Sequence, residues 1–236
     1  MNTQKLTPRL LAVASLTHGG FVADVGTDHA FLPIYLVETG KATRALATDI
    51  RSGPLARAKD NIAQHGLMPK IETMLTGGLE GLENYPLDDI VIAGMGGLNI
   101  IEILSAADFI RERRTHLILQ PMQNVTELRR YLAESGFCVD REALAIDDGK
   151  IYQMMSAAFD GKAHALTPVE EMLGAYNIEH KNEQPRELSA LCERQISALD
   201  VRINGLRTAH RDATCERELK IIIENEKSKA DKLWQR

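Results

Sequence analysis

Two carboxylates and a histidine crowd one short turn near the start of the chain. The segment FVADVGTDHAFLPI begins as an apolar strand at Phe21, turns through Asp24, Gly26, Asp28 and His29, and becomes apolar again. Such a turn can cap the helix that follows it, or it can form the mouth of a ligand site beyond a strand end. Its two carboxylates favour a cationic ligand over an anionic one.

Polar or glycine-rich residues also follow four later strand-like segments. These are Asp49 with Ile50, the run Gly77, Gly78 and Leu79, the run Gly94, Met95, Gly96 and Gly97, and the pair Gln120 and Pro121. A single glycine after a strand is ordinary turn chemistry, and the GMGG run could merely let a helix pack closely on a sheet. Because such residues end five successive strands, we expect a ligand site at that edge of the sheet.

The elements that must position these residues alternate between strand and helix patterns. We expect strands at 21–26, 44–50, 70–76, 89–97 and 116–121, and helices at 8–16, 30–40, 54–65, 98–114 and 124–136, with Thr7, Ser52 and Asn124 as helix caps. An Asp148-Gly149 turn joins two further strands over 137–159. This α/β pattern predicts a parallel sheet with helices on both faces and an antiparallel edge. That is a Rossmann-like fold of the methyltransferase type rather than the dehydrogenase type.

The chain changes character after about residue 163, where helix formers replace strand patterns. Small or apolar residues recur in steps of four and three at Cys192, Ile196, Leu199, Ile203 and Leu206, which is typical of a coiled-coil-like seam. A second helix, at 213–233, carries the apolar residues Leu219, Ile222 and Ile223. We therefore expect an α/β domain over 1–162 and a helical hairpin domain over 163–236.

Composition narrows the class of protein. The 236 residues are 44% hydrophobic and carry a net charge of −5, so a packed core is expected and a bulk basic surface for nucleic acid is not. Three widely spaced cysteines without a CxxC or Cys/His pattern predict free thiols and no metal site. No signal-peptide pattern and no apolar run near the roughly 18 residues of a membrane span occurs, so we expect a cytoplasmic protein without membrane contact.

The charges of the first turn discriminate between two nucleoside cofactors. An acidic residue that ends the second strand, here Asp49, is the usual partner of ribose hydroxyls. A dinucleotide site needs a G-x-G-x-x-G loop, whereas this loop is GTDHA, and Asp28 would repel a pyrophosphate. S-adenosylmethionine has no phosphate and carries a sulfonium and an ammonium, which suit Asp24 and Asp28. The sequence therefore favours S-adenosylmethionine.

Four segments carry a family resemblance. VADVGTDHAFLPI, ATDIRSGPLARAKDNI, IVIAGMGG and LILQPM resemble those of the bacterial tRNA (adenine-N1)-methyltransferases that modify adenine 22, the TrmK family. The resemblance covers residues 5–159 and places the helical tail as in that family. It implies an S-adenosylmethionine-binding class I methyltransferase domain, a coiled-coil-like helical domain that contacts tRNA, and methylation of adenine N1 in the D-arm region.

The same resemblance implies roles for the strand ends. Asp24, Gly26 and Asp28 belong to the methionine side of the cofactor, Asp49 and Ile50 to its ribose and adenine side, and Gly77, Gly78 and Leu79 to its adenine. Gly94, Met95, Gly96 and Gly97 form the loop that faces cofactor and target base, with Gln120 and Pro121 nearby. Family members often have an acidic or amide residue near Gly78, so TGGL departs from the pattern and leaves that contact to backbone groups.

Asp28 is the candidate catalytic residue, because a carboxylate past the cofactor could stabilise the cationic methylated adenine. Its alternative role is to cap the next helix, and His29 is expected to pack or hydrogen-bond rather than react. The candidate RNA-binding residues are Lys5, Arg9, Arg111, Arg113, Arg114, Arg129 and Arg130. The alternative for each is a solvated helix face with intrahelical ion pairs.

Two other functions are compatible with the sequence. One is a methyltransferase for a small molecule or a protein, with the tail as a lid or an oligomerisation element. The other is a non-catalytic adaptor on a cofactor-binding fold, which the retained Asp24, Asp49 and glycine strand ends disfavour. We expect a monomer, with a weak dimer through the helical tail as the alternative.

Overall fold

The computed structural model describes residues 5–235 and contains, within them, a seven-stranded sheet in the order β3-β2-β1-β4-β5-β7-β6. Five strands are parallel: β1 (Gly20–Val25), β2 (Ala42–Asp49), β3 (Ile71–Leu75), β4 (Asp89–Met95) and β5 (His116–Pro121). β7 (Lys150–Phe159) is antiparallel to β5 and pairs with β6 (Phe137–Asp147) at the edge. The predicted Rossmann-like sheet with its antiparallel hairpin is confirmed. Asp148 and Gly149 both have positive φ, as a tight hairpin turn requires.

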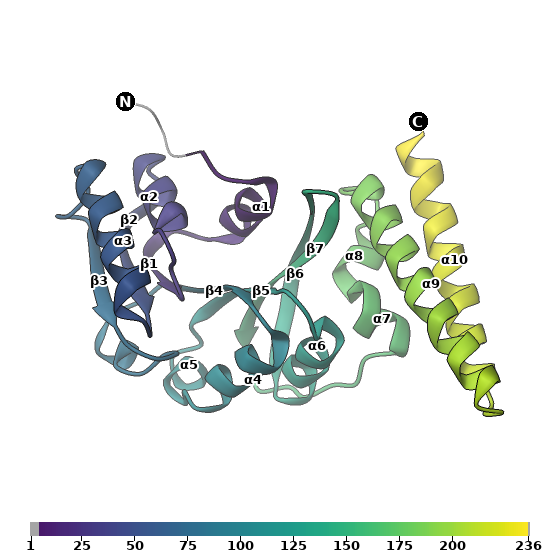
Figure 1. Ribbon diagram of the computed structural model, residues 1–236. Coiled ribbons are helices and arrows are strands. Elements are labelled where there is room, and N and C mark those ends of the chain that lie inside the picture. Colours follow the sequence, from purple (N-terminus) through teal and green to yellow (C-terminus); the bar gives the residue numbers. More distant parts are fainter. Residues whose placement is uncertain (1–4, 236) are drawn as a thin grey trace.

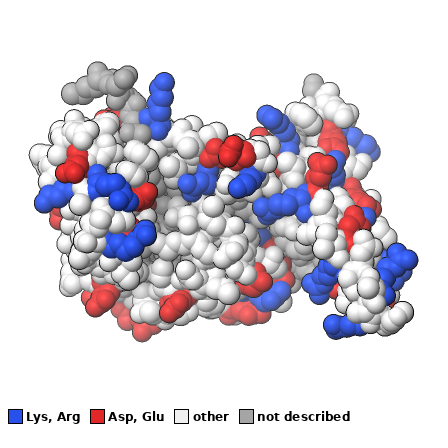
Figure 2. Space-filling model, in the orientation of Figure 1, with Lys and Arg blue, Asp and Glu red and all other residues white. Residues whose placement is uncertain are grey.

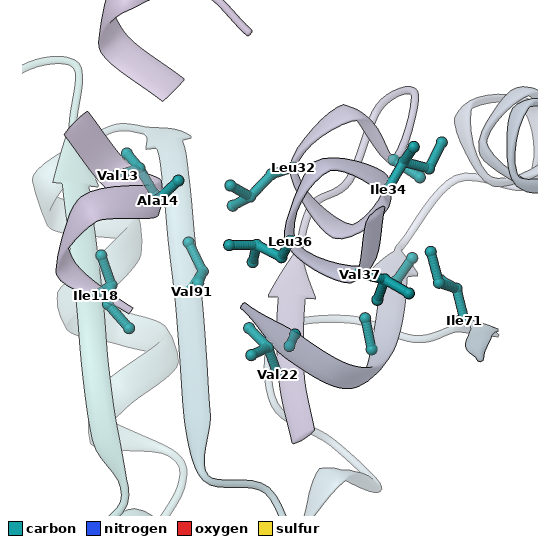
Figure 3. Packing of buried hydrophobic residues seen from close by; sticks show 14 of the residues in the cluster. Val13, Ala14, Val22, Leu32, Ile34, Leu36, Val37, Ile71, Val91 and Ile118 are labelled. Atoms are coloured by element: carbon teal, nitrogen blue, oxygen red, sulfur yellow. The ribbon is translucent and has the colours of Figure 1, made fainter. Parts of the chain in front are cut away.

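Helices cover both faces of the sheet (Figure 1). α1 (Pro8–Leu16), α2 (Phe31–Glu38) and α3 (Ser52–Gln64) pack on one face, where Val13, Leu36 and Ile62 are fully buried (Figure 3). α4 (Gly97–Ser105), α5 (Phe109–Glu112) and α6 (Val125–Glu134) pack on the other. The short 3₁₀ helix η1 (Leu82–Asn84) precedes β4. With apolar cores on both faces, the central strands are buried on both sides and leave only their ends for chemistry.

Of the three predicted helix caps, one is confirmed, one is wrong and one is confirmed in its position only. Thr7 caps α1 by accepting a hydrogen bond from the Leu10 N–H. Ser52 is not a cap, because it is already the first helical residue of α3 and the Asp49 carboxylate accepts the Arg51 N–H instead. Asn124 takes the cap position of α6 in a left-handed conformation, but its side chain makes no capping bond.

The expected helix 98–114 is two helices in the structure. α4 ends at Ser105, and the hydrogen bond from the Ala107 N–H goes to Leu104, three residues back, so the chain tightens and turns. The turn keeps Ala107 and Ile110 buried against the same face of the sheet as Leu104. Burial of apolar side chains therefore takes precedence over continuation of one helix.

Four helices follow the sheet: α7 (Pro168–Leu173), α8 (Ala175–Glu179), α9 (Pro185–Thr208) and α10 (Thr214–Trp234). α9 and α10 lie side by side as an antiparallel pair, where Cys192, Leu199 and Ile203 of the expected seam are buried (Figure 1). Ile223 is buried as expected, whereas Ile222 faces outward and is 46% exposed. The same core includes Leu144 and Ile151, so this helical region packs on the β6–β7 hairpin.

No helix within residues 5–235 is both long enough and apolar enough to span a membrane.

Candidate active site

The carboxyl ends of β1, β2, β3 and β4 surround a pocket of about 1200 Å³. Of the residues that the sequence assigns to the cofactor, eight line this pocket: Gly26, Asp49, Ile50, Gly77, Gly78, Leu79, Gly94 and Met95. Parallel strands point their carboxyl ends to one edge of a sheet, which is why residues 70 positions apart in the chain meet here. Asp24, Asp28, Gly96, Gly97, Gln120 and Pro121 do not line it.

Asp49 is the best-placed polar group of the pocket. It ends β2, is only 5% exposed, and its Oδ1 accepts the Arg51 N–H at 2.7 Å. The next residue, Ile50, is 72% exposed and offers an apolar surface beside Gly77, whose added Cβ would lie 3.2 Å from the Ile50 side chain. A buried carboxylate beside an exposed apolar face matches the ribose and base of a nucleoside.

The turn that follows β1 forms one wall of the pocket through Val25 and Gly26. Gly26 has a φ of +80°, and a Cβ there would lie 2.4 Å from the Met95 Cε, so glycine is needed for both conformation and space. Burial raises the pKa of Asp24 to about 6, and the nearby Thr27 side chain opposes that rise. Within the described part of the chain, the buried hydroxyl of Thr48 has no hydrogen-bond partner. This strand end thus holds a polar group that the chain itself does not satisfy.

Asp28 lies outside the pocket, in solvent-exposed surroundings. Its side chain is 60% exposed, and its Oδ1 accepts a hydrogen bond from Arg57 of α3 at 2.6 Å. That bond, rather than any capping bond, holds the pKa of Asp28 below its usual range. The capping role is wrong, because Ala30 occupies the cap position of α2. His29 packs as expected, with its ring stacked on Phe31 at 5.1 Å between centroids.

The loop after β4 is tied to the loop after β5. The Met122 N–H donates to the Met95 carbonyl at 2.7 Å, and the Gly97 N–H donates to the Gln123 carbonyl at 2.8 Å. A Cβ on Gly97 would lie 2.3 Å from the Asn124 carbonyl oxygen. Gly97 is therefore a packing glycine that lets α4 start against this backbone, which was the alternative interpretation of the GMGG run.

Gln120 supports the same loop from beneath. It is fully buried, and its Oε1 accepts hydrogen bonds from the Gly94 N–H at 3.2 Å and from Arg9 Nη1 at 2.6 Å. Gln120 thus positions the pocket-lining Gly94 without lining the pocket itself. Pro121 lines a second cavity, between the β6–β7 hairpin and α9.

Sequence reasoning missed several pocket residues on α4 and on the loop after β3. Asn99, Glu102 and Ile103 line the pocket from the first turns of α4, and Thr76 lines it from the end of β3. Their signal was available, because positions 99, 102 and 103 share one helix face directly after the glycine loop.

The charge of the pocket decides which ligand it can take. Its described lining contains six acidic residues, Asp49, Glu80, Glu83, Glu102, Asp108 and Glu112, and two arginines, Arg51 and Arg113. A pyrophosphate would meet net negative charge, whereas a cationic nucleoside would not. The carboxylate of Asp49 and the apolar face of Ile50 fit S-adenosylmethionine.

The candidate RNA-binding arginines have different surroundings. Arg129 is wrong as an RNA contact: it is 2% exposed and its guanidinium binds Glu142, Gln153 and the Glu171 carbonyl, tying α6 to the hairpin and α7. Arg130 forms a two-bond ion pair with Glu171. Spacing could have identified Arg129, because buried Ala133 lies one helical turn after it on the same face.

The basic run at 111–114 precedes β5 in the chain, and its Arg113 lines the pocket. Arg111 donates to the Tyr131 hydroxyl, and Arg113 donates to the Glu83 and Tyr85 carbonyls. Arg114 lies two residues before His116, where β5 begins. Arg9 instead reaches Gln120 at the carboxyl edge, and Lys5 is exposed before α1.

A polar cluster that sequence reasoning missed lies at the amino edge of the sheet. Ligand atoms of His18, Asp89 and His116 lie within 4.8 Å of one another. The two imidazole rings stack at 3.8 Å with 13° between their planes, so their in-plane lone pairs do not converge on one point. His116 also uses both nitrogens, toward Asp89 and toward Ser156. Asp89 and His116 thus have hydrogen-bond partners, and the largely exposed His18 stacks on His116.

Comparison with known proteins gives the pocket a family. A model of the methyltransferase domain matches residues 6–155. The tRNA (adenine(22)-N(1))-methyltransferase of Bacillus subtilis is 37% identical over 169 residues, which cover 68% of this chain and 71% of that protein. A putative tRNA methyltransferase of Mycoplasma pneumoniae is 31% identical over 165 residues, covering 68% of this chain and 74% of that protein.

Solved structures agree over nearly the whole chain. The crystal structure of the B. subtilis m1A22 tRNA methyltransferase TrmK has a TM-score of 0.76 at 26% identity, covering 98% of this chain and 99% of that one. M. capricolum TrmK in complex with S-adenosyl-homocysteine has a TM-score of 0.75 at 28% identity, covering 96% and 98%. The chain therefore belongs to the methyltransferase-domain family and, within it, to the tRNA (adenine(22)-N(1))-methyltransferases.

Proposed function

We propose that this protein uses S-adenosylmethionine to methylate N1 of adenine 22 in tRNA. The observation that carries the proposal is the acidic pocket at the carboxyl edge, with Asp49 and Ile50 on one side and the Gly94-Met95 loop on the other. The identity of the methyl acceptor is inferred from the family, because the B. subtilis relative is a tRNA (adenine(22)-N(1))-methyltransferase.

The cofactor, when bound, supplies a methyl group on a positively charged sulfur. Asp49 would accept hydrogen bonds from its ribose hydroxyls, and Ile50 and Leu79 would flank its adenine. Asp24 lies next to the pocket-lining Val25 and Gly26, and an ammonium group at the methionine end of the cofactor would favour ionisation of its carboxylate. Gly26 keeps Met95 clear of the space between cofactor and target.

Adenine N1 already has a free lone pair, so no proton must leave before it attacks the methyl group. Positioning the base in line with the methyl group then supplies much of the rate enhancement. N1 takes part in Watson–Crick pairing and stacking brings neighbouring bases close, so the target base must be exposed before it enters the site. The loop at Gly94–Gly97, held by Gln120 and by the backbone at Gln123, is the surface that receives it.

Asp28 is the residue proposed to stabilise the cationic product. Its carboxylate is exposed and ionised, because Arg57 holds its pKa low. To serve the product, it exchanges the Arg57 guanidinium for the charged adenine. With saturating cofactor, Asp28→Asn should lower kcat by roughly 100-fold, the usual scale for a positioned acid–base or charge-stabilising group.

A matched control is Asp60→Asn, which neutralises a different exposed carboxylate. Asp60 lies on α3, the helix that also carries Arg57. Asp60→Asn should leave kcat unchanged. Normal turnover by Asp28→Asn would exclude the catalytic role, and a rise in the KM for S-adenosylmethionine alone would make Asp28 a cofactor contact.

The remaining parts of the proposal concern the whole chain. Residues 1–162 form the cofactor-binding domain, and residues 163–236 form a helical domain that contacts the tRNA. Arg9, which reaches Gln120 at the carboxyl edge, and the exposed Lys5 are the preferred RNA contacts of the α/β part. The protein works as a monomer in the cytoplasm. Light scattering with and without tRNA measures the oligomeric state.

Transfer of a labelled methyl group to an unmodified tRNA transcript tests the function. Nucleoside analysis should yield N1-methyladenosine, and a transcript with guanine in place of adenine 22 should accept no label. Label in a protein or a small molecule instead would support the second function, and cofactor binding without transfer to any acceptor would support the adaptor.

A further inference from the structure

A second cavity, of about 570 Å³, lies between the β6–β7 hairpin and α9. We call it the hairpin groove. Figure 2 shows the molecule hollowed between the sheet region and the C-terminal helices, with Lys and Arg side chains around the recess. The groove begins at Pro121 and Met122, and the Met122 N–H is bonded to the carbonyl of Met95 in the pocket-lining loop. It therefore adjoins the place where the target adenine enters.

The lining of the hairpin groove combines apolar and cationic side chains. Met122, Val125 and Ile146 supply apolar surface, and Arg194 of α9 and Lys150 of the hairpin supply positive charge. Glu193 is the acidic residue of the lining. Cations beside an apolar floor match the phosphate and the sugar or base of one nucleotide.

Arg194 contacts the hairpin through a backbone carbonyl and not through an ion pair. Its Nη1 donates to the Ile151 carbonyl at 2.9 Å, and it forms no ion pair with any carboxylate of residues 5–235. Partial burial against the hairpin lowers its pKa. By contrast, Arg202, Lys220 and Lys227 each contact a carboxylate of the helical pair. Arg194 therefore has guanidinium donors available for an external anion.

Gln153 supplies an independent sign of an external acceptor. It lines the groove and is 1% exposed, and its Oε1 accepts a hydrogen bond from Arg129. Its Nε2 has no hydrogen-bond partner within the described residues. A buried amide donor without an acceptor is unfavourable, and oxygen atoms of a nucleotide are acceptors that could satisfy it.

We propose that the hairpin groove holds one nucleotide of the tRNA strand next to the target adenine, with its phosphate on Arg194. The inference rests on the proposed function for the identity of the RNA. Lys150 adds a second cation at the rim, and the apolar floor contacts the sugar or base. In this arrangement α9 and the hairpin grip the strand while the neighbouring adenine enters the pocket.

The test is the affinity for unmodified tRNA at several salt concentrations. Arg194→Gln should weaken binding by about tenfold and lower the magnitude of the salt slope by about 0.7, the value for one contact to a single-stranded phosphate. Arg194→Lys should keep most of the slope, because it keeps the charge. Affinity for S-adenosylmethionine should stay at its wild-type value, and the Tm should fall by no more than a few degrees, because the variant loses the hydrogen bond to the Ile151 carbonyl.

Arg202→Gln is the matched control, since Arg202 lies on the same helix and is paired with Glu216 at 2.9 Å. It should leave tRNA affinity unchanged. If Arg194→Gln folds poorly, Lys150→Gln at the exposed hairpin tip tests the same groove. It should lower the magnitude of the salt slope of tRNA binding by a similar amount. Wild-type affinity and slope in both groove variants, or equal losses in Arg202→Gln, would overturn the proposal.

The two proposals fail separately. A wild-type protein that makes no N1-methyladenosine but binds tRNA through Arg194 loses the proposed function and keeps the groove. A wild-type protein that methylates adenine 22, with groove variants that bind tRNA normally, keeps the function and loses the groove.

Discussion

The two edges of the sheet each carry a buried aspartate at a strand terminus, but with opposite surroundings. At the amino edge, Asp89 is fully buried and accepts hydrogen bonds from the Gly19 N–H and from His116. At the carboxyl edge, Asp49 lines a large pocket, accepts one backbone N–H, and has its Oδ1 at 3.7 Å from the Nε of the exposed Arg51. The contrast teaches that a buried carboxylate marks a ligand site when its surroundings leave it bonding capacity, rather than by its burial alone.

The physical origin of the contrast lies in the connections. Glycine-rich turns follow β1, β3 and β4 and leave space, whereas the His18 and His116 rings stack beside Asp89 and fill theirs. Ser156 of β7 completes that network by binding His116 and Asp140. One edge is thus stabilised by its own side chains, and the other is left for a cofactor.

The largest expected difference comes from removing one charge at each edge. Asp49→Asn should weaken S-adenosylmethionine binding by about 10- to 100-fold, because hydrogen bonds to a charged group contribute about 1.5–3 kcal/mol. Asp89→Asn should leave that affinity within about twofold, since the sites are independent, and should lower stability by about 1–3 kcal/mol. Calorimetric titration and thermal unfolding measure the two quantities. Loss of cofactor binding in Asp89→Asn would break the distinction.

A smaller effect on cofactor affinity is expected when alanine replaces a glycine with positive φ at the pocket, with the same change far from the pocket as the comparison. Gly26→Ala puts a Cβ against Met95 and should weaken cofactor binding by about tenfold, since Met95 must move into the pocket. At Gly40, with a φ of +73°, an added Cβ meets no described atom within 4 Å. Gly40→Ala should therefore cost only the backbone strain of about 1–2 kcal/mol. Equal cofactor affinities for the two variants would show that the Met95 contact is unimportant.

The smallest expected effect is a pH dependence from Asp24. Its folded pKa of about 6 lies above its ordinary value of 3.8, so its stabilising contribution to the free protein is complete below pH 3.8 and is lost as pH rises through 6. A cationic cofactor favours the ionised carboxylate, so binding should weaken about fourfold from pH 7 to 5.5.

Asp24→Asn should abolish that pH dependence, whereas Asp28→Asn should preserve it, because the pKa of Asp28 is already lowered by Arg57. Titrations of S-adenosylmethionine binding at the two pH values measure the effect. An unchanged dependence in Asp24→Asn would assign the titration to another group.

Much of the site could be predicted from strand ends, and its exceptions have physical causes. Asp49 and Gly94 line the pocket because they end parallel strands at one edge. Asp28 was open to two roles, and capping failed because Ala30 takes the cap position in a left-handed conformation. Arg129 looked like a surface cation beside Arg130, but α6 turns it inward to Glu142. Local spacing alone does not reveal which long-range partner a side chain meets.

The sequence by itself determined the alternation of strands and helices, the hairpin at Asp148-Gly149, the acidic turn and the family. These depend on local periodicity, turn residues and short motifs, which are written in consecutive positions. Only the tertiary structure decided that Asp89 and His116 bond to one another while the pocket beside Asp49 is open, and that Arg194 lines the hairpin groove without a carboxylate partner in residues 5–235. Those outcomes depend on hydrogen bonds and charges between residues far apart in the chain, which form only when the sheet and the helical region pack together.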